Sequence, residues 1–189
     1  MSTINVSRRR FLQTSAVTGG GLVVGLAVTG CSGTPAPLPV ARTQGAWTPN
    51  AFLQVLPDNT IRFYTARSEM GQGVTTGLAT LVGEELDVNP LDMEIRLAGA
   101  HEDYVNPAFS MQGTGGSTSI RAHYLQLRQV GANTRALILE AASQDLGVPV
   151  SSLSTENGYI VQGASRHPYA DFITTCLLYT SPSPRDGTK

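Results

Sequence analysis

The chain has 189 residues, of which 41% are hydrophobic and 14% are charged, and this length is sufficient to bury one hydrophobic core. Its 20 glycines are typical of a globular protein with many turns. The formal net charge of −1 at pH 7 gives no electrostatic reason for nucleic-acid binding, so we expect no nucleic-acid partner.

The first thirty residues are predicted to be an export signal. Residues 7–13 read Ser-Arg-Arg-Arg-Phe-Leu-Gln, which fits the twin-arginine export pattern. The weakly apolar stretch at 16–28 contains four glycines and is shorter than the roughly 20 apolar residues that a membrane span needs. An ordinary secretory signal is the alternative. We expect an exported, periplasmic protein.

Cys31 is a predicted lipidation site. Residues 28–31 read Val-Thr-Gly-Cys, which resembles a lipobox, where cleavage before the cysteine leaves a thiol that can be acylated and anchored to a membrane surface. Cleavage nearby, with a soluble product, is the alternative. The proline-rich residues 31–50 then form a stiff, extended tether.

The other end of the chain also differs from the middle. Residues 176–189 contain the only lysine, Lys189, whereas residues 31–175 contain eight arginines and no lysine. We interpret 176–189 as a foreign, adaptor-derived tail, with a genuine terminus as the alternative, and place the partial folded domain at 51–175. Because residues 32–175 lack cysteine, this domain cannot hold an iron–sulfur cluster or a cysteine-ligated zinc by itself.

Within the domain, the pattern first predicts a hairpin, a helix and a strand. Two β-rich runs at 51–56 and 60–66 flank a Pro-Asp-Asn turn. Apolar residues at helical spacing predict a helix over 74–86. Alternation predicts a half-buried strand over 91–98, whose inward positions are Met93, Ile95 and Leu97.

A second, longer helix is predicted over 120–146, ended by Gly147. Small residues at Gly131 and Ala132 indicate close packing against a neighbour. A short hairpin at 153–155 and 159–161 surrounds an Asn-Gly turn, and another helix begins at 169. The predicted buried face of the long helix is Tyr124, Leu127, Gly131, Thr134, Ile138 and Ala141. The fold class is therefore α+β, with short hairpins and a mixed sheet packed against two main helices.

Two glycine-rich loops are the candidate binding elements. One contains Gly71, Gln72 and Gly73, where flanking glycines let the neutral amide approach a ligand. The other precedes the long helix and comprises Thr114, Gly115, Gly116, Ser117, Thr118 and Ser119. Its glycines, hydroxyls and helix start favour a phosphate or pyrophosphate. Simple helix capping by serine or threonine is the alternative for this loop.

Other polar residues give weaker signals. His101, His123 and His167 have no metal-ligand spacing, so we expect packing or surface positions and no protein-ligated metal. The sequence leaves open whether Arg121 and Arg128 face a phosphate or line a helix.

Several segments together resemble a known family. The matching segments are 68–78 (Ser-Glu-Met-Gly-Gln-Gly-Val-Thr-Thr-Gly-Leu), 84–88 (Glu-Glu-Leu-Asp-Val), 112–121 (Gln-Gly-Thr-Gly-Gly-Ser-Thr-Ser-Ile-Arg), Tyr124 and 127–128 (Leu-Arg). Over roughly residues 47–173 they resemble the molybdopterin-binding large subunit of the xanthine dehydrogenase and aldehyde oxidase family, of the isoquinoline 1-oxidoreductase beta subunit type.

The resemblance implies a molybdenum hydroxylase fragment that binds molybdopterin cytosine dinucleotide, with the metal held by the pterin dithiolene. It places Gln72 near the molybdenum and pterin, and the 114–119 loop at the pyrophosphate and nucleotide. It also implies an iron–sulfur partner subunit, a possible membrane-bound electron acceptor, and hydroxylation of an N-heterocycle or aldehyde with oxygen from water.

The family's catalytic base is a glutamate near its C-terminus, and no segment here matches it. We therefore expect the base beyond the end of this chain, and the fragment alone to be inactive. The alternative function is a non-catalytic lipoprotein domain that binds an anionic ligand or a protein partner.

Overall fold

The computed structural model describes residues 43–178. The predicted export signal, Cys31, most of the predicted tether and residues 179–189 lie outside the described residues. The fold already includes Trp47, ahead of the predicted start at 51, because Trp47 is buried and its backbone N–H donates to the Val55 carbonyl at 2.9 Å.

The predicted opening hairpin is present, and a third strand extends it. Strand β1 (Leu53–Val55) pairs antiparallel with β2 (Ile61–Thr65), and β2 pairs parallel with β3 (Glu94–Leu97) in the order β1-β2-β3. Helix α2 (Val74–Leu86) has the predicted bounds and connects β2 to β3. Parallel neighbouring strands need such a crossover connection. The first candidate loop, which contains Gly71, Gln72 and Gly73, therefore lies between the central strand β2 and helix α2.

Strand β3 departs from the prediction in two ways. Residues 90–92 form a 3₁₀ turn, η1 (Pro90–Asp92), so the strand begins later than expected. Met93 is buried as predicted, but Leu97 is 64% exposed. β3 is the last strand of its sheet, and no element of residues 43–178 covers the end where Leu97 lies. Alternation of apolar and polar residues along a strand does not indicate whether another element covers its apolar face.

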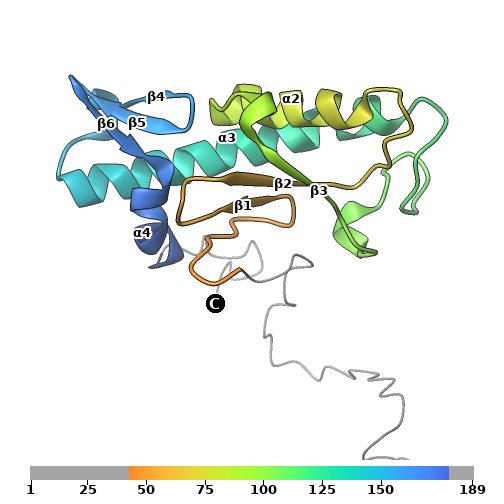
Figure 1. Ribbon diagram of the computed structural model, residues 1–189, viewed down its shortest axis with the longest axis horizontal. Helices are drawn as coiled ribbons and strands as arrows, with labels where there is room; N and C mark the ends of the chain where they lie inside the picture. The colour runs from red at the N-terminus through yellow and green to blue at the C-terminus, as the bar shows by residue number, and fades with distance from the viewer. Residues whose placement is uncertain (1–42, 179–189) are drawn as a thin grey trace, which may run out of the picture. The chain divides into compact units, whose positions relative to one another are not determined.

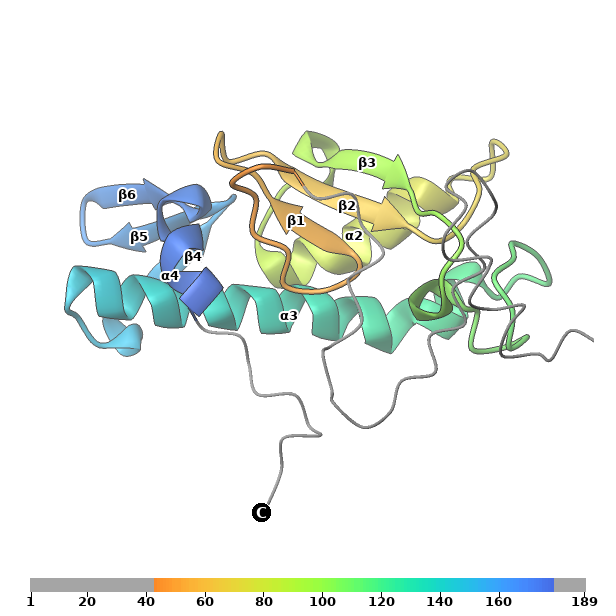
Figure 2. The ribbon, with the colours of Figure 1, turned by 90° about the horizontal axis from the view of Figure 1, so that it is seen from below.

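Helices α2 and α3 (Ser119–Leu146) lie side by side and run in the same direction (Figures 1 and 2). Near their starts, a Cβ on Gly77 would stand 2.8 Å from Ile120 Cδ1. Further along, a Cβ on Gly131 would stand 2.5 Å from the Val82 carbonyl oxygen. The predicted close approach at Gly131 is therefore confirmed, and only glycine permits it.

The buried face of α3 matches the prediction except at its beginning. Leu127, Gly131, Thr134, Ile138 and Ala141 are buried. Tyr124, predicted inside, is 43% exposed, and His123 is buried in its place. Both 123 and 124 lie at helical spacing from Leu127, so periodicity could not choose between them. Ala132, the other small residue, is exposed, and its predicted packing role is wrong.

A second three-stranded sheet lies beside the C-terminal half of α3 (Figure 2). It has the order β4 (Ser154–Glu156), β5 (Tyr159–Gln162) and β6 (Ser165–Pro168), all antiparallel. The first two strands form the predicted hairpin, and β6 was not predicted. A short 3₁₀ turn, η3 (Val150–Ser152), leads from α3 into this sheet.

The predicted last helix begins as a 3₁₀ turn, η4 (Tyr169–Phe172), and continues as α4 (Ile173–Leu178). The buried Tyr169 hydroxyl donates to the Leu86 carbonyl at 3.0 Å and joins this end to α2. Cys176 is buried in α4 as a free thiol, and burial raises its pKa to about 12. The fold class is thus α+β, as predicted.

We predict that Gly131→Ala destabilises the chain by about 1–2 kcal/mol, because the added methyl group meets the Val82 carbonyl and overpacking outweighs the helix-propensity gain. Urea unfolding measures the change. Ala132→Ser, at an exposed neighbouring position, is the control and should shift the free energy of unfolding by less than about 0.5 kcal/mol. Equal effects of the two substitutions would contradict the close helix contact.

Candidate functional site

The two candidate loops meet at the common end of α2 and α3. The Ser68 backbone N–H, on the first loop, donates to Thr114 Oγ1 on the second at 2.9 Å. Between them is a pocket of about 420 Å³. Its lining residues are Met70, Gln72, Gly73, Val74, Gly77, Thr114, Gly115, Ser117, Ser119 and Ile120. Of the predicted site residues, Gly71, Gly116 and Thr118 lie outside this wall. The chemical roles of all of them stay predictions.

Glu69 holds the first loop in shape. Its Oε1 accepts hydrogen bonds from the Gly71 and Gly73 amides at 2.8 and 3.0 Å, and its Oε2 accepts one from the Thr75 amide at 3.0 Å. The Thr75 and Gly73 hydrogen bonds lower the pKa of Glu69 to about 2. The ionised carboxylate therefore occupies the positive end of the α2 dipole.

The first loop also needs its glycines. Gly71 and Gly73 have φ angles of 93° and 76°, in the left-handed region. A Cβ at either position would meet no atom within 4 Å, so the cost of a side chain there is conformational rather than a clash. These two turns let the amides of Gly71, Gly73 and Thr75 converge on Glu69, which also accepts from the Met70 amide at 3.2 Å.

Gln72 lines the pocket, but its amide is folded back on its own loop. Oε1 accepts from the Met70 backbone N–H at 2.6 Å, and Nε2 donates to the Ser68 carbonyl at 3.1 Å. Contact with a ligand would require these hydrogen bonds to be exchanged. The predicted approach of Gln72 to a metal-bound group stays a prediction.

The start of α3 lacks a side-chain cap. Thr118 is the N-cap residue, but its hydroxyl donates to the Gly115 carbonyl at 2.8 Å and accepts from Asn106 Nδ2 at 2.8 Å. No side chain of residues 43–178 accepts from the first amides of the helix. The capping interpretation of this loop is therefore wrong for Thr118, and the positive end of a 28-residue helix is left open beside the pocket.

Gly115 leaves the pocket wall accessible. A Cβ added to Gly115 would meet no atom within 4 Å, so the backbone there is open to a neighbour. Gly116, with φ 58°, and Ser117, with φ 52°, turn the chain into α3. Among the described residues, no charged side chain lines this pocket. The site combines backbone donors, hydroxyls and a helix dipole, which suits an anion.

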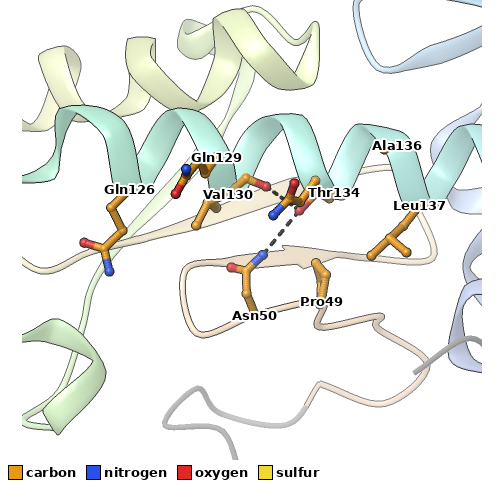
Figure 3. A pocket seen from close by; sticks show the side chains of 9 residues that line it. Pro49, Asn50, Gln126, Gln129, Val130, Thr134, Ala136 and Leu137 are labelled. Atoms are coloured by element: carbon orange, nitrogen blue, oxygen red, sulfur yellow. Dashed lines mark hydrogen bonds between the residues drawn. The ribbon is translucent and has the colours of Figure 1, made fainter. Parts of the chain in front are cut away.

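A larger cavity, of about 640 Å³, lies elsewhere on α3 (Figure 3). Figure 3 shows Gln126 and Gln129 on the helix opposite Pro49 and Asn50, with Asn50 Nδ2 donating to Thr134 Oγ1 at 3.2 Å. Neutral amides and aliphatic side chains line it, and neither predicted loop contributes. Volume is a weaker guide than chemistry here, so we take the smaller pocket as the candidate site.

Arg121 and Arg128, for which the sequence did not decide between a phosphate-facing and a helix-lining position, both lie outside the pocket. Arg128 forms an ion pair with Glu85 and lies over the Tyr124 ring, so it lines the outside of the helix pair. Arg121 is exposed and does not line the pocket. Within residues 43–178, no group of His, Cys, Asp and Glu side chains could hold a metal ion, and no helix is long and apolar enough to cross a membrane.

Comparison with known proteins connects this geometry to a family. The sequence profile described as "Molybdopterin cofactor-binding domain" matches residues 2–187. The chain is 29% identical over 166 residues to the beta subunit of isoquinoline 1-oxidoreductase from Brevundimonas diminuta, covering 87% of this chain. It is 27% identical over 170 residues, or 89% of the chain, to the membrane-bound aldehyde dehydrogenase [pyrroloquinoline-quinone] of Gluconacetobacter polyoxogenes. The chain spans 21% of the length of each of these curated relatives.

Solved structures give weaker matches. Quinoline 2-oxidoreductase from Pseudomonas putida 86 superposes with a TM-score of 0.47 at 16% identity, over 64% of this chain and 15% of that one. CO dehydrogenase from Oligotropha carboxidovorans superposes with a TM-score of 0.47 at 20% identity, over 70% of this chain and 16% of that one.

We predict that Glu69→Gln makes the Gly71, Gly73 and Thr75 amides exchange severalfold faster with solvent deuterium, because the substitution removes the shared carboxylate acceptor. In the parent chain, these three amides should stay protected from exchange above pH 4.5, the ordinary pKa of the carboxyl. Their protection should fall as the pH drops toward 2. Glu84→Gln, on the exposed face of α2, is the control. Unchanged protection of these amides in Glu69→Gln would contradict the conclusion that the carboxylate holds the loop in shape.

Proposed function

Because the chain belongs to the molybdopterin cofactor-binding domain family, we propose that the pocket at the start of α3 holds the pyrophosphate of molybdopterin cytosine dinucleotide. The uncapped helix carries this proposal. A long helix whose first amides have no side-chain acceptor within residues 43–178 offers hydrogen bonds and a positive dipole end to a phosphate.

The rest of the wall fits the same group. The hydroxyls of Thr114, Ser117 and Ser119 supply further donors, and Gly115 lets a bulky ligand approach the backbone. No carboxylate of the described residues lines the pocket, where it would repel a phosphate. The Glu69 carboxylate instead compensates the positive end of the α2 dipole. The start of α2 is therefore neutralised, whereas the start of α3 is not.

When bound, the cofactor would supply the redox chemistry of a molybdenum hydroxylase, with its metal held by the pterin dithiolene. The residues of this chain bind and orient it. The α3 amides and loop hydroxyls would fix the pyrophosphate, and the 68–73 loop would approach the pterin end. The Gln72 amide would exchange its internal hydrogen bonds for the ligand.

The reaction of the complete protein is part of the proposal. We infer hydroxylation of an N-heterocycle or an aldehyde, since curated relatives are named isoquinoline 1-oxidoreductase and aldehyde dehydrogenase.

Two relatives are named as single subunits of their enzymes: the beta subunit of isoquinoline 1-oxidoreductase, and the B subunit of nicotinate dehydrogenase from Pseudomonas putida strain KT2440. These names support a partner subunit, and we propose from the sequence resemblance that this subunit carries the iron–sulfur clusters. A membrane-bound electron acceptor is a further expected partner.

The proposed location rests on the sequence. The twin-arginine pattern at 7–13 supports export to the periplasm, and the lipobox ending at Cys31 supports a lipid anchor. The twin-arginine route carries folded proteins, which suits a protein that acquires its cofactor before export.

We predict that the 189-residue chain binds cytidine diphosphate and that Gly115→Asp weakens this binding by about tenfold or more, because a carboxylate would stand beside the ligand phosphates. Gly115→Asn, which has the same shape without the charge, is the matched control: it carries the same steric effect on the approach of the ligand, so it should bind more tightly than Gly115→Asp, by about tenfold or more. An added Cβ at Gly115 meets no atom within 4 Å, so neither substitution creates a clash at that carbon. Isothermal titration calorimetry measures the dissociation constants, and equal affinities for the Asp and Asn variants would contradict the proposed pyrophosphate site.

A further inference from the structure

Arg67 is a buried cation without a carboxylate partner among the described residues. Its side chain is fully buried, and no described acidic residue lies within 4.0 Å of its guanidinium. Nη1 donates to the Ala66 carbonyl at 2.8 Å and Nη2 to the Tyr104 carbonyl at 3.2 Å, while Nε has no hydrogen-bond partner within residues 43–178. Burial lowers the pKa of this guanidinium. An uncompensated buried charge costs stability, so a role is expected for it.

The third partner of the Arg67 guanidinium is a buried, neutral histidine. His123 Nε2 lies 2.8 Å from Arg67 Nη2, and His123 Nδ1 lies 3.0 Å from the Ser119 carbonyl oxygen. A carbonyl only accepts, so Nδ1 carries the hydrogen and Nε2 accepts from the arginine. Burial, and then the Arg67 charge, lower the pKa of His123. The pair therefore carries one positive charge rather than two.

This pair is connected to both candidate loops, through the chain neighbour of Arg67 and through a hydrogen bond of His123. Arg67 directly precedes Ser68, whose amide donates to Thr114 Oγ1. His123 hydrogen-bonds the carbonyl of Ser119, the first residue of α3 and part of the pocket lining. The described wall of the pocket has no charged side chain of its own. A charge in a poorly polarisable interior acts over several ångströms, so Arg67 need not touch an anion in the pocket to act on it.

We propose that Arg67, held by His123, is a positioning residue whose buried charge favours the phosphate groups of the ligand in this pocket. The proposal rests on the proposed function and deepens it. It explains why an arginine without a described acidic partner lies beneath two loops that offer neutral donors to the pocket. The ligand supplies the compensating negative charge that the described part of the protein does not.

The test compares Arg67→Lys with Arg67→Gln in the full 189-residue chain. Both substitutions remove the planar guanidinium that reaches two carbonyls and His123, but only lysine keeps the charge. The probe is inorganic pyrophosphate, measured by calorimetry at pH 8. We expect Arg67→Lys to bind within about threefold of the parent and Arg67→Gln to bind about tenfold more weakly. Arg166→Gln, which removes one exposed positive charge from β6, should leave the affinity within about twofold.

Equal affinities of the lysine and glutamine variants would overturn the inference, because a purely structural arginine depends on geometry rather than on charge. A second measurement needs no variant. The Nε–H resonance of Arg67 should shift when pyrophosphate is added to the parent chain, while that of Arg166 should not, and an unmoved Arg67 resonance would also overturn the inference. If neither pyrophosphate nor cytidine diphosphate binds the parent chain, the proposed function itself fails. Binding that depends on Gly115 but not on the Arg67 charge would refute only this inference.

Discussion

The close parallel contact between α2 and α3 is the constraint on which the site depends. Gly131 lets the helix backbones approach, and Gly77 makes room for the Ile120 side chain near the helix starts. Because the helices run in the same direction, both begin at the same end of the fold, and the loops that precede them meet there (Figure 1). An antiparallel pair would separate these loops by the length of a helix. The pocket follows from this packing rather than from either loop alone.

The N-termini of α2 and α3 differ in whether a side chain compensates the helix dipole. Glu69 neutralises the start of α2, whereas Thr118 turns its hydroxyl away from the start of α3. Arg67 then adds a buried charge behind the loops, at a cost in folding stability. In the proposed function, the open start of α3 and the buried Arg67 charge would both favour a phosphate in the pocket.

The sequence predicted the elements well and the details of burial less well. Period-two and helical patterns located the opening hairpin, α2, α3 and the Asn-Gly hairpin, because those signals are local. The exposure of Leu97 and the exchange of His123 for Tyr124 depend on neighbouring layers, which periodicity does not report. The glycines, the hydroxyls and the predicted helix start indicated the two loops, and the resemblance assigned a part of the cofactor to each. The missing cap on α3 and the lack of a described partner for Arg67 Nε arise from side-chain orientations that no sequence pattern encodes.

The central claim is that phosphate binds the open start of α3, and backbone amide chemical shifts test it most directly. The measurement is a titration of the isotopically labelled 189-residue chain with cytidine diphosphate. The account predicts the largest shifts at the amides of Ser119 and Ile120, with smaller ones at Thr114 and Gly115. Shifts concentrated instead around the groove at Gln126 and Gln129, or no shifts at all, would contradict it.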